Sequence, residues 1–469
     1  MTTHKTIWTF AITSVALFMV TLDNLVVTTA LPVIRTDLDA DIAGLEWTVN
    51  AYTLVFAVLL LTGAALGDRF GRRRIFALGL GIFTFASAAA AVAPSIDTLN
   101  LARAVQGLGA ALVMPLTLTL LSAAVSPARR GLALGAWGGI SGLAVAFGPL
   151  VGGAVVSGIS WPWIFWLNVP IGLVLVPLAL ARLEESYGPP RRFDLPGLAL
   201  ASAGLFGIVW GLVRANSLGW SSPEIVVSLA AGAALTAAFV AWEARTPEPM
   251  LPLRFLRNRT FALANTASLL MSFGMFGSIF LLAQFFQTAQ SYTPFESGLR
   301  ILPWTAMPMI VAPIAGALSD RIGGHVLMGT GLALQAAGLA WIAAVSSPGV
   351  TYAELVVPFT ISGIGMGLFF APVANVVLSS VGRSEEGQAS GVNSTVRELG
   401  GVFGVAVLAS VFAHTGGYGS PATFNDGMVP AVLVGSLVVL GGSVAAFAAG
   451  RRRRRSEAVD AEPALELSA

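Results

Sequence analysis

Long apolar runs recur along almost the whole chain and are separated by short polar connections. A helix of about 20 apolar residues crosses the roughly 30 Å of hydrocarbon in a bilayer, and with that length the sequence predicts about fourteen spans. They are expected over residues 8–34, 45–66, 73–93, 98–125, 131–157, 163–182, 193–214, 223–243, 259–284, 296–318, 324–345, 351–378, 387–413 and 427–449. The pattern therefore predicts an all-α, multi-pass membrane protein.

Composition agrees with this class and excludes others. Charged residues make up 11% of the 469 residues, whereas soluble domains carry about 25%. Cysteine is absent, and the three histidines make no metal-ligand spacing. Because no nucleophile–base set, phosphate loop or ligand cluster is recognisable, we expect no enzyme activity, no metal and no cofactor.

The basic residues predict the orientation. Most of the 26 lysines and arginines fall on one side if the N-terminus is inside, so both termini are expected in the cytoplasm. Five arginines at 451–455 follow the last span and are expected to bind anionic lipid headgroups. A nucleic-acid-binding tail is the less favoured interpretation of these arginines, and we expect no nucleic-acid partner.

An internal repeat divides the chain. The segment GAALGDRFGR at 63–72 returns as GALSDRIGG at 316–324, and several later glycines repeat at a constant offset. The two copies lie farther apart than six helices require, by about the length of one helix pair, so six, two and six helices are expected. The predicted domains are an N-terminal six-helix bundle at residues 1–185, a two-helix linker at 186–250 and a C-terminal six-helix bundle at 251–450. A tail that is first basic and then acidic follows at 451–469.

Five motifs occur in order along the first half. They are Asp23 to Pro32 in the first span, GDRFGRRR at 67–74, Arg103 to Gly109, GPLVGG at 148–153, and Trp161 to Gly172. Together they resemble the major facilitator superfamily, and specifically its fourteen-helix drug:proton antiporter family. The resemblance implies the major facilitator fold and alternating access between two halves.

The resemblance also implies a function. The chain is expected to export small amphipathic organic compounds in exchange for protons, across a bacterial inner (plasma) membrane. A dedicated exporter of one natural product or metabolite stays open as an alternative. A membrane sensor or scaffold that does not transport is a further alternative, against which charged residues inside the spans argue.

Proton coupling is assigned to charged residues within the spans. The resemblance places Asp23 and Arg103 on the central cavity, although a static ion pair is the alternative. Arg397 and Glu398 lie near mid-membrane, about 100° apart around their helix, so we expect one of them to face the cavity and the other a neighbouring helix. Apart from interfacial residues, only Asp23 and Glu398 are expected to offer negative charge deep in the membrane.

Gating is assigned to two motifs. Residues of the repeated loop are expected to latch the cytoplasmic side, the alternative being that they only set topology; they are Asp68, Arg69, Gly71, Arg72, Asp320 and Arg321. The 148–153 motif is expected to act as a hinge, because the repeat mate of Pro149 is Val405, and the alternative is plain helix packing. Its candidate residues are Gly148, Pro149, Gly152 and Gly153.

A looser set of polar, aromatic and methionine side chains is predicted to line the substrate pocket. At helical spacing such residues also pack in cores, so this interpretation stays open for each of them. The set comprises Trp47, Asn50, Tyr52, Met114, Asn168, Phe273, Phe276, Gln284, Gln287, Asn375 and Asn393.

Overall fold

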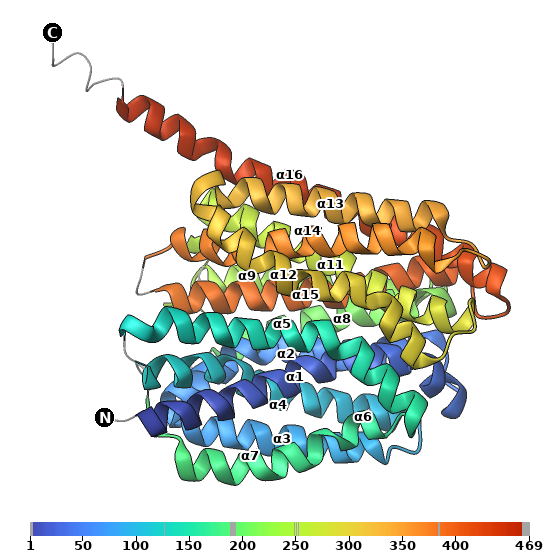
Figure 1. Cartoon of the computed structure of the whole chain (residues 1–469), viewed down its shortest axis with the longest axis horizontal. Helices are drawn as coiled ribbons and strands as arrows, with labels where there is room; N and C mark the ends of the chain where they lie inside the picture. The colour runs from blue at the N-terminus through green and yellow to red at the C-terminus, as the bar shows by residue number, and fades with distance from the viewer. Residues whose placement is uncertain are drawn as a thin grey trace.

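The chain folds into a bundle of long, roughly aligned helices, with both termini at one end (Figure 1). The computed structural model describes residues 3–125, 127–187, 194–247, 249, 251, 253–382 and 385–461. The first half contains α1 (Thr3–Asp37), α2 (Ile42–Phe70), α3 (Arg72–Ala91), α4 (Ile96–Ala124), α5 (Pro127–Gly158), α6 (Trp163–Trp166) and α7 (Asn168–Arg182). It is followed by α8 (Leu195–Leu218), α9 (Pro223–Glu243) and α10 (Arg254–Arg257). The second half contains α11 (Arg259–Thr288), α12 (Pro294–Ile322), α13 (Gly324–Val345), α14 (Tyr352–Ser379), α15 (Glu386–Thr415) and α16 (Pro421–Ala461).

Thirteen of the described stretches are long and apolar enough to cross a membrane, with α6 and α7 forming one span. Helix α5 has 32 residues, but only Phe147–Gly158 counts as apolar helix within its described part. The all-helical class is therefore confirmed, and the number fourteen stays a prediction. The tail from residue 462, with the side chains of the arginines at 451–455, lies outside the described part of the chain.

Local sequence signals set the helix ends. Asp41 accepts a hydrogen bond from the Gly44 amide at 2.7 Å, and Thr293 forms a capping box with Glu296 at the start of α12. The α2–α3 and α12–α13 connections turn at Gly71 and Gly323, whose φ angles are +106° and +95°. Only glycine takes such angles at little cost, so the repeated loop needs its repeated glycine.

The two halves pack alike. Helix α1 packs on α5, and α4 on both α2 and α3; in the same way α11 packs on α15, and α14 on both α12 and α13. The halves meet through α5 against α12 and α2 against α15. This is the arrangement that a parallel repeat predicts, while the exact domain limits stay a prediction.

The repeated glycines lie where helices touch most closely. A Cβ atom on Gly107 would stand 2.4 Å from the Tyr52 carbonyl oxygen, and one on Gly363, its repeat mate, 2.5 Å from the Trp304 carbonyl oxygen. Each contact joins corresponding helices of its half. In a bilayer, where helices gain little from hydrophobic burial against one another, such close approach is a main source of stability.

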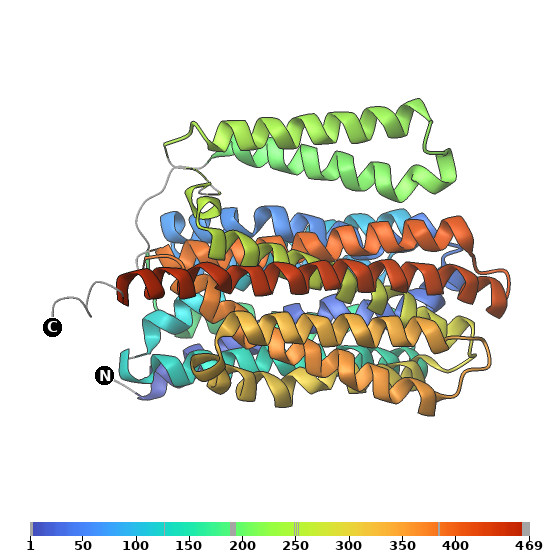
Figure 2. The same cartoon turned by 90° about the horizontal axis from the view of Figure 1, so that it is seen from above.

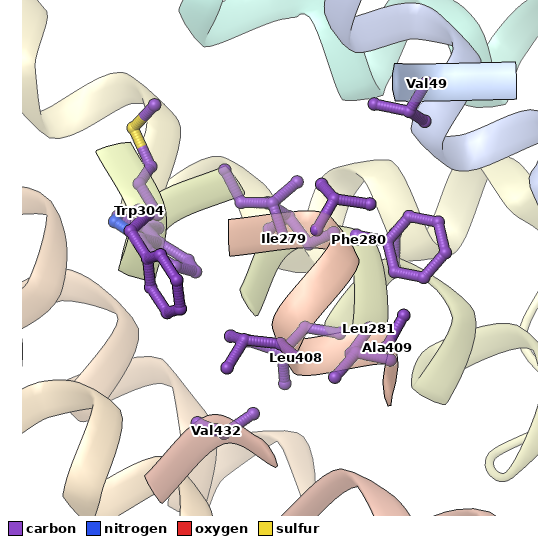
Figure 3. Packing of buried hydrophobic residues seen from close by; sticks show 14 of the residues in the cluster. Val49, Ile279, Phe280, Leu281, Trp304, Leu408, Ala409 and Val432 are labelled. Carbon is purple, nitrogen blue, oxygen red and sulfur yellow. The ribbon is translucent and has the colours of Figure 1, made fainter. Parts of the chain in front are cut away.

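The α8–α9 hairpin lies outside the bundle (Figure 2), and α8 packs against both α2 and α15. Trp47 of α2 stacks on Phe206 and Trp210 of α8, with ring centroids 5.7 and 5.9 Å apart. The hairpin therefore covers one of the two seams between the halves. Inside the bundle, the largest buried cluster brings Val49 of α2 together with residues of α11, α12, α15 and α16 (Figure 3).

Candidate functional site

A cavity of about 1890 Å³ lies between the halves. It opens at the end that carries both termini and the α2–α3 turn, where Asp68, Arg72, Arg254 and Glu385 line its mouth. We call this the basic end, because arginines 72–74, Arg254 and Arg257 lie there. The opposite end, called distal below, is closed.

The depth of the cavity is mainly apolar and aromatic, with a few polar groups. Four of the predicted lining residues do line it: Tyr52, Met114, Phe276 and Asn393. Sequence reasoning missed Thr21, Asn24, Phe56, Met275 and Phe370. Thr21 and Asn24 share a helical face three residues apart in an apolar run, and that spacing was a usable signal.

The other predicted lining residues lie elsewhere in the described structure. Trp47 packs on α8, Phe273 is buried in the core, and Asn375 is exposed. Asn50 is fully buried on α2. These four, like Asn168, Gln284 and Gln287, do not line this cavity, because composition does not tell which way a helix face points. A substrate contact by any of them stays a prediction.

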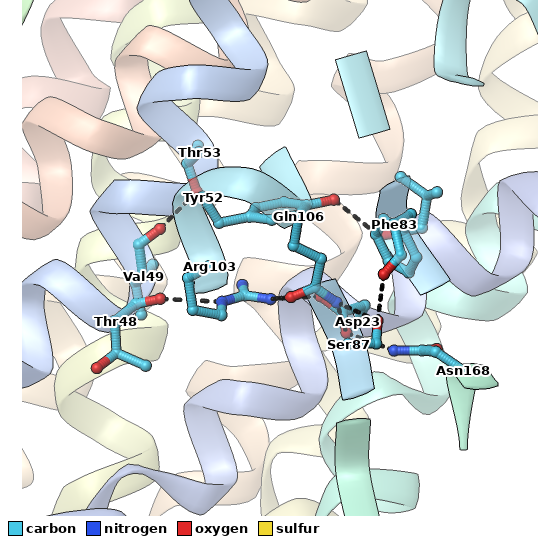
Figure 4. A network of polar contacts seen from close by, with 11 residues as sticks. Asp23, Thr48, Val49, Tyr52, Thr53, Phe83, Ser87, Arg103, Gln106 and Asn168 are labelled. Carbon is cyan, nitrogen blue, oxygen red and sulfur yellow. Dashed lines mark hydrogen bonds and ion pairs between the residues drawn. The ribbon is translucent and has the colours of Figure 1, made fainter. Parts of the chain in front are cut away.

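Asp23 is the acceptor at the centre of a buried polar network (Figure 4). Its carboxylate accepts hydrogen bonds from Arg103 Nη1 at 2.5 Å, Gln106 Nε2 at 2.8 Å and Asn168 Nδ2 at 2.7 Å. Gln106 also donates to Ser87 Oγ at 2.9 Å. The contacts join α1, α3, α4 and α7, so Asn168 holds the carboxylate rather than a substrate.

Arg103 extends the network to α2. Its Nε donates to the Thr48 carbonyl oxygen at 3.1 Å, and its guanidinium carbon lies 4.3 Å from the centre of the Tyr52 ring. The side chains of Asp23 and Arg103 are 1% and 0% exposed. The ion pair that the sequence proposed is therefore present and fully enclosed.

Neither Asp23 nor Arg103 is among the described residues that line the cavity, contrary to expectation. Asn24 lies about 100° further around α1, and it lines the cavity in place of Asp23. Tyr52, which lines the cavity, lies against Arg103 on its other side. The Tyr52 ring therefore connects the enclosed ion pair with the cavity.

In the second half Arg397 and Glu398 both line the cavity. Arg397 Nη2 lies 3.9 Å from Glu398 Oε1, so the expectation that only one of them faces the cavity was wrong. The long arginine side chain spans the angle between neighbouring helical positions. Glu398 Oε2 is buried without a hydrogen bond, whereas the Arg397 side chain is 30% exposed.

At the basic end the repeated loop is held within its own half. Arg72 Nη2 lies 2.7 Å from Asp68 Oδ1, and Glu185 accepts a hydrogen bond from the Arg73 amide at 2.9 Å. Arg69 and Arg321 lie at the same end, while the Asp320 side chain lies outside the described part. A latch across the halves at this end stays a prediction.

The distal end is closed by contacts between the halves, which we call the distal gate. Gln287 Nε2 donates to the Thr29 carbonyl oxygen at 2.9 Å, and the Phe295 amide donates to Ser157 Oγ at 3.0 Å. The Arg35 guanidinium lies 4.0 Å from the centre of the Tyr418 ring.

Within the distal gate the Tyr418 hydroxyl donates to Gln284 Oε1. Burial raises the pKa of Tyr418, so the phenol keeps its proton and stays a donor. Gln284 and Gln287 therefore belong to this gate and not to the pocket.

The 148–153 motif supports the distal gate by close packing. A Cβ atom on Gly153 would stand 2.2 Å from the Pro294 carbonyl oxygen, and one on Gly152 would stand 2.6 Å from the Val26 carbonyl oxygen. Gly148 packs in the same way against the Leu25 side chain. The motif thus brings α5 against α1 and α12, while its role as a hinge stays a prediction.

A further buried carboxyl was missed. Glu46 is only 2% exposed, although it lies near the distal start of α2. It stands at the second residue of a predicted span, where sequence reasoning places interfacial residues. The packing of α2 against the second half buries it instead.

The fold and cavity are matched by known proteins. The family model of the Major Facilitator Superfamily matches residues 13–405. The chain belongs to this superfamily. The facilitator is similar over 407 residues to the multidrug resistance protein Stp of Mycobacterium tuberculosis (strain CDC 1551 / Oshkosh), with 37% identity covering 86% of this chain and 75% of that protein.

Further relatives of the facilitator carry related names. It is 34% identical to the tetracenomycin C resistance and export protein of Streptomyces glaucescens, over 89% of this chain and 78% of that one. The crystal structure of an auto-inhibited POT family peptide transporter superposes with a TM-score of 0.68 at 15% identity. That match covers 96% of the facilitator and 97% of the transporter, and it shows the shared fold.

Proposed function

We propose that this facilitator exports small amphipathic organic compounds in exchange for protons, across a bacterial plasma membrane, with both termini in the cytoplasm. The observation that carries the proposal is the cavity, which is open at the basic end and bordered through Tyr52 by an enclosed carboxylate–guanidinium pair. The basic end is then cytoplasmic by the positive-inside rule. The names of the multidrug and antibiotic export relatives support the same function.

In this mechanism the substrate enters from the cytoplasm and packs among aromatic and methionine side chains. A proton that reaches Asp23 from outside neutralises the carboxylate and weakens its hydrogen bond to Arg103. Because Arg103 stacks on Tyr52, the change reaches the cavity wall. One elementary charge moving through 100 mV supplies about 2.3 kcal/mol to such a cycle.

Glu398 is the second proposed proton carrier and the deep anionic group of the cavity. Its unpartnered Oε2 atom and the loose 3.9 Å contact with Arg397 leave it able to pair with a cationic substrate. The anionic headgroups of the bilayer are the proposed partners of the basic tail.

The decisive experiment measures pH-driven accumulation of tetraphenylphosphonium in proteoliposomes with an acidic lumen. We expect accumulation that a protonophore abolishes, because the proton gradient is the energy source. A gradient of substrate that survives the protonophore would exclude proton coupling, and the absence of any flux would favour a sensor or scaffold.

Substrate breadth separates a multidrug exporter from a dedicated one. The tetracenomycin C export relative favours the dedicated alternative, whereas the mainly apolar and aromatic cavity favours breadth. Competition of tetraphenylphosphonium flux by chemically unrelated amphipathic compounds would decide. Inhibition by one chemical class alone supports the dedicated exporter.

The Glu398→Gln variant is expected to discriminate by substrate charge. It keeps the shape of the side chain and removes its charge, so transport of a monovalent cation should fall about tenfold, which corresponds to about 1.4 kcal/mol. Flux of a neutral compound of matched hydrophobicity, driven by its own gradient, should change less. Glu354→Gln is the control, because that residue caps α14 away from the cavity. Equal losses for the two substrates would remove Glu398 from cation binding.

A further inference from the structure

Helix α2 carries two buried polar side chains that the mechanism above does not use. Glu46 and Asn50 are 2% and 0% exposed. Glu46 Oε2 and both polar atoms of the Asn50 amide make no hydrogen bond in the described structure. Four residues apart, the two side chains share one face of the helix.

That face lies at the seam between the halves. Leu45 and Val49 pack into the cluster that contains α11 and α15, while Trp47 packs against α8. At about 100° per residue, Glu46 and Asn50 fall between these two faces of α2. Helix α15 packs against α2, and Leu54 and Val58 of α2 share a buried cluster with Val402 and Ala406 of α15.

Glu46 also lies at the distal end of its helix. It stands in the second turn of α2, which begins at Ile42 directly after the N-cap residue Asp41. Arg35 stacks on the Tyr418 ring at 4.0 Å, but no ion pair joins it to Glu46 within the described chain. Glu46 therefore lies beneath the gate with an acidic neighbour and no paired cation.

Helices packed against α2 carry further charged groups. Where their side chains are described, none makes a hydrogen bond or ion pair with Glu46. They are Lys5, Asp23, Arg35 and Asp37 on α1, residues 72–74 on α3, Asp97 and Arg103 on α4, Arg214 on α8, and Arg397, Glu398 and His414 on α15. Arg103 is engaged by Asp23.

A buried carboxylate with neither a cation nor a hydrogen-bond donor is strongly disfavoured, whereas the neutral acid is far easier to bury. We propose that Glu46 is a proton-binding site of the distal gate, protonated while the gate is closed and able to ionise when opening admits water. Asn50, one turn further along α2, then meets the same water. Acid on the distal side therefore favours the conformation seen here, with the cavity open at the basic end.

The proposal can be tested without any transported substrate, so its outcome is independent of the export activity. The chain has no cysteine, so single labels can be introduced cleanly. Val92→Cys and Ser347→Cys place exposed reporters on the α3–α4 and α13–α14 connections, one in each half. Spin-label distances between them, measured in lipid nanodiscs from pH 5 to pH 9, report opening of the distal end.

In the otherwise unchanged protein we expect the distal-open population to grow as pH rises. One linked proton changes the open-to-closed ratio by at most about tenfold per pH unit. Glu46→Gln imitates the protonated acid, so it should hold the distal end closed and remove the part of the pH response that comes from Glu46. Asp97→Asn, at an exposed acid of the same end, should leave the response unchanged.

A distal end that opens with pH as readily in Glu46→Gln as in the parent overturns the proposal. The proposal is also overturned if the distal-open population of the parent protein does not change with pH. It is overturned too if that population changes with Na⁺ concentration at constant pH.

Discussion

Asp23→Asn is expected to reduce pH-driven efflux to the level of empty liposomes. The substitution keeps the side-chain volume but removes the titratable group. It also turns an amide donor either toward Arg103 or toward Gln106 and Asn168, all of which donate to Asp23. Flux measured in proteoliposomes under an imposed pH gradient tests this, and efflux at the parent rate would exclude Asp23 from coupling.

The same variant should lose stability, which the sequence alone did not suggest. It leaves the fully buried Arg103 without its anion, and breaking a buried pair typically costs about 3–5 kcal/mol. Substrate exchange without a pH gradient separates the two effects. If a folded Asp23→Asn protein still exchanges substrate, the defect lies in coupling. If the variant loses both its fold and its exchange, the Asp23–Arg103 pair has a structural role.

Gly153→Ala is expected to cut the transport rate about tenfold or more, equivalent to about 1.4 kcal/mol of destabilised gate. A Cβ atom there would stand 2.2 Å from the Pro294 carbonyl oxygen and 2.7 Å from the Phe295 Cα atom. Because these are backbone atoms, α5 and α12 must separate and the distal gate cannot close fully. Labelling of a cysteine at Ser157 by a membrane-impermeant reagent should rise in parallel.

The matched control lies on the same helix. A Cβ atom on Gly158 would meet no neighbouring atom within 4 Å, so Gly158→Ala should leave transport and labelling unchanged. If Gly153→Ala behaves as Gly158→Ala does, the close contact between α5 and α12 is not needed for the cycle.

The sequence predicted the features that repeat or depend on local chemistry. Apolar runs of bilayer length predict helices because a bilayer offers backbone groups no other partner. The glycine of the 67–74 loop and its mate in the second half predict two matching turns, and Gly71 and Gly323 make them. The Asp23–Arg103 pair was the alternative interpretation, because a charge inside a span needs a partner, whereas both residues were expected to face the cavity.

The tertiary structure decided which way each helix face points. Asp23 and Asn24 are neighbours in sequence, yet only Asn24 lines the cavity, because α1 packs against α4, α5 and α7 on the side that holds Asp23. Gln284 and Gln287 were assigned to the pocket but lie at the distal gate. Gln287 donates across the halves to the Thr29 carbonyl oxygen, and Gln284 accepts from Tyr418, whose ring contacts Arg35 of the first half.

Glu46 shows the same division most plainly. A glutamate at the start of an apolar run is expected at the lipid–water boundary, and nothing in its neighbours along the chain says otherwise. Each helix obeys local rules, but Glu46 is buried beneath the gate only because α2 packs against α15, which lies about 350 residues further along the chain. By itself the sequence determined the helices and their repeat, because these depend on local apolar length and glycine. The cavity wall, the gate and the setting of Glu46 were decided by contacts between helices distant in sequence.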